Sequence, residues 1–304
     1  MPGKSNNTEM LHQEPISNEK VNQEEQQERG EQTRSWTIPE FSPGVRLFFK
    51  ILANFITTLN FASGVIAIIL VAIAPRNPIY ALWAAKLILL GIIFDFSDGI
   101  PARLAQKKPG FFGTVVDSVA DTITFGLAPA VVIALSLPIL GTSGSALALA
   151  IVTVIVGCYF AFCTIFRLVR FTKSPSKKWF HGIPAPGAGS AAASYIIIKL
   201  YLEEQLGLVD TIAIPAVGLI FMVITATLMI IRTKYPTTKL RKNALEIFLL
   251  GLAAVTIVTV VAMPFQFIIY PAGLMAALTV FYISYGPFYM IKHMMERAKE
   301  VEDY

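Results

Sequence analysis

Long apolar segments recur along this chain from residue 50 onward, and they limit its possible folds more than any other feature. The hydrocarbon core of a bilayer is about 30 Å thick, so a helix needs roughly 20 apolar residues to cross it. Because backbone polar groups in lipid must be paired within their own segment, each such segment is expected to be a helix. The segments are 53–74, 79–98, 113–137, 145–168, 187–208, 210–231, 244–263 and 266–291. We therefore predict an all-α, polytopic transmembrane helical bundle of about eight spans.

The N-terminal region differs from the rest of the chain. Of the 304 residues, 55% are hydrophobic and only 15% are charged, yet residues 1–35 are rich in Glu, Gln and Asn. We predict a disordered cytosolic tail there, and no cleaved signal, because a basic segment followed by an apolar one is lacking. Residues 36–52, "WTIPEFSPGVRLFFKIL", mix aromatic, basic and apolar side chains. This mixture is typical of an amphipathic juxtamembrane helix, and a simple linker is the alternative.

Basic residues favour one orientation of the bundle. With the N-terminus in the cytosol, the cytosolic loops and C-terminal tail hold sixteen Lys and Arg residues, whereas the outside loops hold only Arg76. Such asymmetry indicates a multi-pass protein of the cytoplasmic membrane with both termini in the cytosol. The formal net charge of +5 is explained by this topology and by attraction to anionic membrane lipids, so no nucleic-acid partner is predicted.

Three residues within the apolar segments need separate interpretation. Cys158 and Cys163 are five positions apart, on different faces of one predicted helix, so we expect packing residues and no disulfide. Lys86 lies well inside the second segment, where an unpaired ammonium is costly. It is expected to face the bundle interior and to find a partner there.

Four aspartates stand in the stretch "FDFSDGIPARLAQKKPGFFGTVVDSVAD", residues 94–121. Asp95 and Asp98 end the second predicted span on the cytosolic side, and Asp117 and Asp121 begin the third. Their spacings place each pair on one side of its helix, so two adjacent helices can direct four carboxylates into one cleft. Crowded carboxylates either take up protons or bind hard cations, and oxygen-only ligands favour Mg²⁺, Mn²⁺ or Ca²⁺. We predict a divalent metal site, holding two ions.

The residues between these pairs indicate a phosphate ligand. Gly99 and Pro101 are expected to interrupt the second helix, and the forked guanidinium of Arg103 suits a phosphate. Gly113 is expected to start the third helix and to leave room for a bulky ligand. Two alternatives remain: the aspartates cap a helix N-terminus, or they line the ion or proton path of a transporter.

The pattern Asp95-x2-Asp98-Gly99-x2-Ala102-Arg103, nine residues, then Gly113-x3-Asp117-x3-Asp121 resembles the signature of the CDP-alcohol phosphotransferase family. These are integral membrane enzymes of phospholipid synthesis. The stretch between the two halves is one residue longer than the eight most often expected, and Pro101 is an unusual filler. The resemblance covers about residues 50–232, so we predict a six-span catalytic core at 53–232. Residues 233–304 would add two spans and a cytosolic tail, as a structural or oligomer-forming annex or as a wall for lipid tails.

The resemblance also implies roles for the residues of the motif. Asp95, Asp98 and Asp117 would bind a dinuclear metal centre, with Asp121 close to it and acting as the general base. Contacts to the CDP part of the donor would come from Gly99, Ala102, Arg103 and Gly113. The implied reaction is attack by an alcohol hydroxyl on the β-phosphorus of a CDP-activated lipid, with release of CMP. A homodimer is implied as well.

The first span carries polar residues at helical spacing, Asn54-x2-Thr57-x2-Asn60-x3-Gly64. One interpretation is hydrogen bonding between helices. The other comes from a resemblance to the first span of the serine-using synthases of that family, in which this helix flanks the nucleotide pocket. On that basis Asn54, Thr57 and Asn60 are predicted to contact CDP.

Two further stretches suggest the acceptor. "RLVRF" at 167–171 and "HGIPAPGAG" at 181–189 resemble elements of the same serine-using synthases. Arg167 and Arg170 are predicted to bind the carboxylate of L-serine, with anchoring to lipid phosphate as the alternative, and His181 is expected to be a loop residue. The predicted reaction is transfer of a phosphatidyl group from CDP-diacylglycerol, or an ether-lipid analogue, to L-serine. Glycerol 3-phosphate, inositol phosphate and choline are the alternative acceptors.

Overall fold

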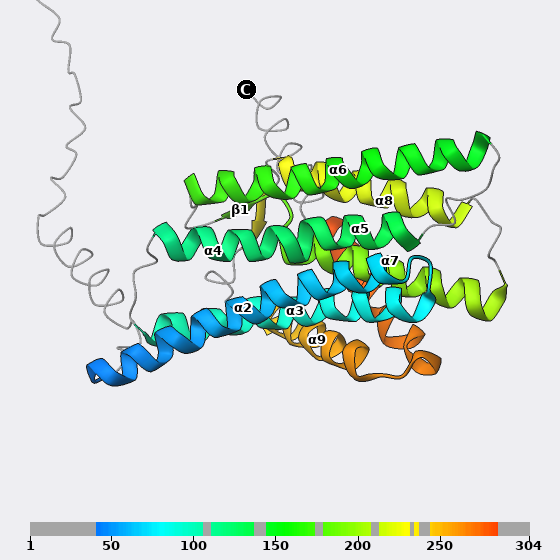
Figure 1. Cartoon of the computed structure of the whole chain (residues 1–304). Coiled ribbons are helices and arrows are strands. Elements are labelled where there is room, and N and C mark those ends of the chain that lie inside the picture. Colours follow the sequence, from blue (N-terminus) through cyan, green and yellow to red (C-terminus); the bar gives the residue numbers. More distant parts are fainter. Residues whose placement is uncertain are drawn as a thin grey trace, which may run out of the picture. The chain divides into compact units, whose positions relative to one another are not determined.

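The computed structural model describes residues 41–105, 111–136, 144–173, 179–207, 213–231, 234–236 and 244–284, and most of them are helical (Figure 1). The helices in chain order are α2 (Pro43–Ile73), α3 (Pro78–Leu104), α4 (Phe111–Asp121), η1 (Thr122–Leu127), α5 (Ala128–Ser136), α6 (Gly144–Lys173), α7 (Ala185–Leu206), α8 (Ala213–Ile230), α9 (Ala244–Ala262), η3 (Phe265–Phe267) and a last helix, Ile269–Ser284. The predicted all-α class is confirmed. The predicted N-terminal tail, 1–35, and the C-terminal tail lie outside the described residues.

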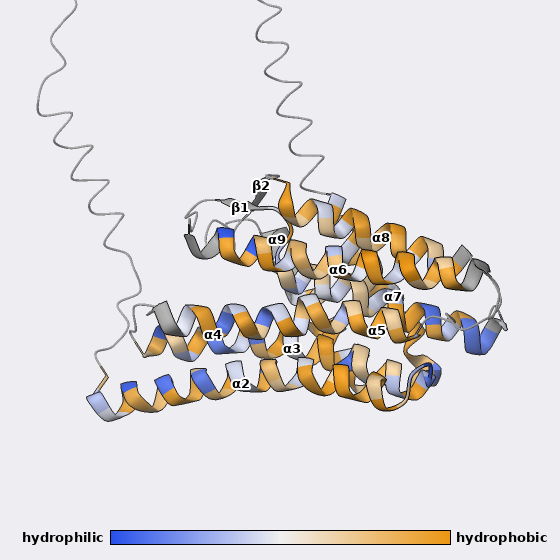
Figure 2. Ribbon diagram, turned by 45° about the horizontal axis from the view of Figure 1, so that its top comes forward, coloured by the Kyte–Doolittle hydropathy of each residue, from blue (hydrophilic) through white to orange (hydrophobic). Residues whose placement is uncertain are grey.

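Within the ranges that the structure describes, four helical stretches are long and apolar enough to cross a membrane, namely Pro43–Ile73, Pro78–Leu104, Gly113–Ser136 and Leu147–Arg170. Shorter apolar helices cover Ile214–Ile230, Gly251–Ala262 and Ile269–Ser284. In Figure 2 hydrophobic residues dominate these helices, and α4 carries several hydrophilic turns. The chain is therefore a helical membrane protein, whereas the count of eight spans stays a prediction. Most of the basic loops that favoured one orientation lie outside the described residues.

Two helices run further than predicted. α2 begins at Pro43, so residues 43–52 form its first turns and there is no break at residue 52. Its 31 residues span about 46 Å, more than a bilayer core needs. The predicted interruption of the second helix is also wrong, because α3 continues through Pro101 to Leu104. The missing N–H of Pro101 removes a single helical hydrogen bond, the one to the Ser97 carbonyl, and α3 ends one turn later.

The third predicted span contains a π-helical turn. α4 begins at Phe111 rather than at Gly113 and ends at Asp121, and η1 then continues directly into α5. A π turn adds one residue to the helical repeat and shifts the faces that precede and follow it. The apolar pattern of the sequence did not indicate this turn.

Thr124, in η1, is the point at which three helices come closest. A Cβ at Gly64 of α2 would lie 2.6 Å from Thr124 Oγ1, and one at Gly91 of α3 would lie 2.4 Å from Thr124 Cγ2. Both glycines and Thr124 are buried. Small residues allow this approach of membrane helices, which is tightened by van der Waals contact and interhelical hydrogen bonds.

A short antiparallel sheet accompanies the helices. β1 (Trp179–His181) pairs with β2 (Lys234–Pro236), so His181 lies in a strand and not in the expected loop. The next residue, Gly182, has φ +81°, and a Cβ there would lie 2.4 Å from the Met229 carbonyl oxygen. Ile183 N donates to the Leu228 carbonyl. The segment before α7 therefore packs against the C-terminal end of α8 and donates a hydrogen bond to one of its last carbonyls.

The two C-terminal helices, α9 and Ile269–Ser284, pack against the core. Lys86 Nζ of α3 donates to the Met263 carbonyl just beyond α9, at 2.6 Å, and lies over the Trp83 ring. This supplies the partner that the sequence left unnamed. The hydroxyls of Ser190 and Thr279 also form a hydrogen bond between α7 and the last helix. Buried apolar residues of the pair are Val260, Ala272, Met275 and Ile283, and Ile268, just before the last helix, is buried as well.

The two cysteines behave as predicted. Cys158 and Cys163 are both free, the first exposed and the second buried.

A first prediction tests the contact at Thr124. Gly91→Ala places a methyl group against Thr124 Cγ2, so we expect a destabilisation of about 1–3 kcal/mol. The measurement is the thermal unfolding midpoint of the purified protein in detergent, which should fall by several degrees.

Gly251→Ala is the matched control, because a Cβ on this exposed residue of α9 meets nothing within 4 Å. It should leave the midpoint unchanged or raise it slightly, since alanine favours helix. Equal midpoints for the two variants would contradict the described packing.

Candidate active site

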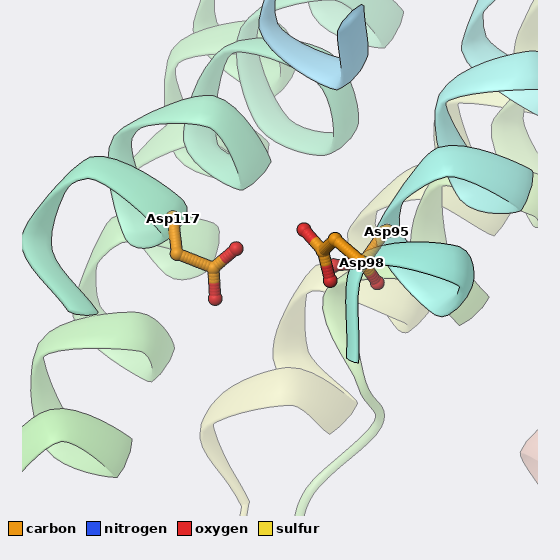
Figure 3. Close-up of side chains that lie close together, drawn as sticks. All are labelled: Asp95, Asp98 and Asp117. Atoms are coloured by element: carbon orange, nitrogen blue, oxygen red, sulfur yellow. The ribbon is translucent and has the colours of Figure 1, made fainter. Parts of the chain in front are cut away.

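Three of the four aspartates form a compact group between α3 and α4. Figure 3 shows Asp95 and Asp98 on one helix and Asp117 on the other, with their carboxylates turned toward one another. One carboxylate oxygen from each residue lies within 4.8 Å of the others, and all three side chains are half-buried. The helical spacing therefore brings together the carboxylates that the sequence predicted to meet.

Asp121 lies beside this group and is more deeply buried. It is the last residue of α4, is 8% exposed, and lies next to the Asp95 carboxylate. Asn60 Nδ2 donates to its Oδ1 at 3.1 Å. The fourth carboxylate is thus held by α2 and lies directly beside the three-residue group.

The carboxylate group fits a divalent cation. Within the described part of the chain, none of the three carboxylates forms an ion pair, and the one recorded pair joins Lys199 to Glu203. Half-buried like charges repel one another unless a cation or protons offset them. Three converging oxygen donors suit a hard ion such as Mg²⁺, Mn²⁺ or Ca²⁺.

The polar residues of α2 take different positions. Thr57 Oγ1 donates to Asp98 Oδ2 at 2.8 Å, and Asn60 is fully buried against Asp121. Asn54 is exposed. Hydrogen bonding between helices, one of the two interpretations of this motif, describes what Thr57 and Asn60 do. Contact of the three residues with CDP stays a prediction.

Arg103 lies at the C-terminal end of α3 on the exposed side of the site. Its Nε donates to the Gly99 carbonyl at 3.1 Å, so the side chain folds back along the helix. Gly99 and Ala102 are half-buried, and Gly113 lies one turn before Asp117. The small residues and the exposed guanidinium thus lie on the same two helices as the three carboxylates.

The two predicted acceptor residues differ in their surroundings. Arg167 is 8% exposed and interacts electrostatically with Asp121 and Asp95. In the part of the chain that the structure describes, its Nε has no hydrogen-bond partner. Arg170 instead donates from Nη1 to the Ile230 carbonyl at 2.6 Å and from Nη2 to the Met229 carbonyl. Arg170 therefore caps the C-terminal end of α8.

Two residues near the site were not found from the sequence. Thr124 follows Asp121 by three positions, which places both residues on one side of a helix. This spacing was the only indication in the sequence, because other apolar helices of the chain contain similar threonines. Tyr282, in the last helix, interacts electrostatically with Arg167. Its segment is so uniformly apolar that the sequence held no indication of this contact.

The family model and the similar proteins that match this chain agree on one family. The family model described as CDP-alcohol phosphatidyltransferase matches residues 50–231. Archaetidylserine synthase of Methanothermobacter thermautotrophicus is 29% identical over 190 residues, which cover 62% of this chain and 70% of that protein. CDP-diacylglycerol--serine O-phosphatidyltransferase of Helicobacter pylori is 29% identical over 184 residues, covering 58% of this chain and 70% of the relative.

A yeast relative matches over a shorter region. CDP-diacylglycerol--serine O-phosphatidyltransferase of Saccharomyces cerevisiae is 33% identical over 150 residues, or 44% of this chain. The match spans about half of that relative, 49% of its length.

A second prediction concerns the three-carboxylate group. Asp117→Asn removes one of the converging charges, so Mn²⁺ affinity should fall by about tenfold or more. The measurement is titration of Mn²⁺ into the detergent-solubilised protein, followed by electron paramagnetic resonance of the free ion.

Glu204→Gln is the control, because it removes an exposed acidic group on α7. This variant should bind Mn²⁺ as the unaltered protein does. The same affinity in Asp117→Asn would rule out Asp117 as a ligand.

Proposed function

The chain belongs to the CDP-alcohol phosphatidyltransferase family, and we propose that this enzyme of phospholipid biosynthesis makes phosphatidylserine and CMP from CDP-diacylglycerol and L-serine. The observation that carries the proposal is the meeting of Asp95, Asp98 and Asp117, with Asp121 beside them. The choice of serine is supported by relatives that are named as serine phosphatidyltransferases or as an archaetidylserine synthase.

Asp95, Asp98 and Asp117 would hold two divalent ions, Mg²⁺ or Mn²⁺, as expected for a group of half-buried carboxylates. When bound, the metal orients the diphosphate and offsets the charge that grows on the leaving phosphate. The carboxylates would hold this charge between α3 and α4, two helices that both pack against α2.

Asp121 is the proposed general base. It would take the proton of the serine hydroxyl while the serine oxygen forms a bond to the β-phosphorus of the donor. The bond from that phosphorus to the bridging oxygen breaks, and CMP leaves with this oxygen. Burial and the Asn60 amide keep the Asp121 carboxylate oriented, so little movement is needed before proton transfer.

The donor nucleotide would lie along the exposed end of α3. The Arg103 guanidinium is accessible there and can pair with the diphosphate, since its fork matches phosphate oxygens. Gly99, Ala102 and Gly113 leave space for the cytidine phosphate by lacking bulky side chains. The lipid tails, diacyl or ether, would extend into the surrounding membrane.

Arg167 is the proposed group for the serine carboxylate. It is a buried cation next to Asp121, and its Nε lacks a partner within the described residues. A carboxylate bound here would offset the guanidinium charge and place the serine hydroxyl near the base. The interaction of Arg170 with α8 supports an anchoring role for that residue instead.

We further propose that the site opens to the cytosol, that both termini lie there, and that the enzyme is a homodimer.

A third prediction tests the reaction. Purified protein with CDP-diacylglycerol and Mn²⁺ should release CMP when L-serine is added, and Asp121→Asn should lower this rate by about 100-fold or more. Parallel assays use glycerol 3-phosphate, inositol phosphate and choline, with CDP-archaeol as a second donor. Release with another alcohol alone would refute serine as the acceptor. Ion flux in sealed vesicles without CMP release would favour a transporter.

A fourth prediction separates the two arginines. Arg167→Lys keeps the charge but loses the fork, so the KM for serine should rise by about tenfold or more while the KM for CDP-diacylglycerol changes little. Arg170→Lys should instead lower the thermal unfolding midpoint, because its hydrogen bonds go to α8 carbonyls. If both variants raised the serine KM equally, Arg170 would also be a serine-binding residue.

A further inference from the structure

Asn60, on α2, is buried beside Asp121. Its side chain is 0% exposed, and its Nδ2 donates to Asp121 Oδ1. A carboxylate only accepts hydrogen bonds, so the amide nitrogen, and not the amide oxygen, must face Asp121. The Asn60 amide therefore binds the Asp121 carboxylate and does not reach the exposed surface of the site.

The backbone of Asn60 is tied to the same turn of the neighbouring helix. Its carbonyl accepts from Thr124 Oγ1 at 2.8 Å and from Ser63 Oγ at 2.7 Å. Thr124 follows Asp121 by three positions and lies in the π turn. One residue of α2 thus holds both Asp121, through its side chain, and Thr124, through its carbonyl.

The close packing at Thr124 fixes this connection. Gly64 and Gly91 leave no space for even a methyl group beside Thr124, and a Cβ at Gly91 would lie 3.0 Å from Asn60 Oδ1. The Asn60 amide therefore has little freedom to turn away from Asp121. A π turn placed directly after a catalytic side chain is a common feature of functional sites.

Thr57 makes the corresponding contact one turn earlier on α2. Its hydroxyl donates to Asp98 Oδ2 at 2.8 Å and also approaches the Ala53 carbonyl. Residues 57 and 60 share a helix face, so the same side of α2 reaches two of the four carboxylates. Asn54, one turn before Thr57, is exposed and has no recorded contact with the four aspartates.

We propose that α2 positions the catalytic carboxylates and does not bind the nucleotide through these residues: Asn60 holds Asp121, and Thr57 holds Asp98. The inference rests on the proposed function for the identity of the reaction, and it goes further by assigning these two side chains as positioning residues. Partners that orient metal-binding or catalytic groups in this way typically contribute about 10- to 100-fold to metal affinity or activity.

The test compares Asn60→Ala, Asn60→Asp and Thr57→Val with Thr58→Val, in the whole chain in detergent. For Asn60→Ala we expect kcat to fall about 10- to 100-fold with the KM for CDP-diacylglycerol within about twofold. Asn60→Asp keeps the size but places a like charge beside Asp121, so its kcat should fall at least as far. Thr58→Val should leave kcat unchanged, because Thr58 is exposed on the same helix and its hydroxyl donates to the Asn54 carbonyl of that helix. A rise in this KM with unchanged kcat in Asn60→Ala would overturn the proposal.

Two measurements without turnover separate this inference from the proposed function. Mn²⁺ affinity should fall in Thr57→Val and recover in Thr57→Ser, which restores the hydroxyl to Asp98. CMP affinity, measured by calorimetry, should be unchanged in Asn60→Ala and Thr57→Val. Loss of CMP binding in variants that keep their thermal unfolding midpoint would show nucleotide contact and overturn the proposal. Absence of CMP release by the unaltered protein with every alcohol would sink the proposed function alone, because the Mn²⁺ and CMP titrations still decide the role of α2.

Discussion

The mutual repulsion of four carboxylates at the end of two apolar helices is the constraint on which the rest of this site depends. A charged group is costly in a low-dielectric setting unless donors or cations surround it. The structure supplies a hydroxyl from Thr57, an amide from Asn60 and the buried guanidinium of Arg167. Three carboxylates remain turned toward one another, as a divalent ion requires. The same charges that would destabilise a helical bundle thus form the proposed binding site for a divalent ion, which would offset them.

Positions within this site depend on how closely α2, α3 and η1 approach. Gly64 and Gly91 admit Thr124 to a distance that any side chain would prevent, and this contact lies one turn from Asp121. Since α2 and α3 carry Thr57, Asn60, Asp95 and Asp98, the separation of the helices also fixes the separation of the carboxylates from their donors. The packing of Gly64, Gly91 and Thr124 therefore also fixes the geometry of the candidate site. An added methyl group at Gly91 would disturb both the packing and this geometry.

Local patterns were sufficient for the helices and for the aspartates. Runs of apolar residues predicted the helical segments, and the i, i+3 and i, i+4 spacings predicted that Asp95, Asp98 and Asp117 face one another, because a helix converts spacing directly into direction. The π turn packs against α2, α6 and α7, and Pro101 is buried, so both features lie where helices meet, and a local pattern does not contain such contacts. The partners of Asn60 and Lys86 are 61 and 177 positions away, and no spacing rule reaches them. Only the polarity of these two residues within apolar segments indicated that partners exist.

The helices beyond the family region extend the core of this particular chain. The family model matches residues 50–231, yet Lys86, inside that region, donates to the Met263 carbonyl outside it. A lysine at this depth without an acceptor would be costly, and a carbonyl just after α9 has no helical partner of its own, so each group satisfies the other. The last helix then packs Met275 and Ile283 into the core and brings Tyr282 to Arg167. Because Arg167 also lies beside Asp121, the last helix approaches the candidate active site at this buried cation.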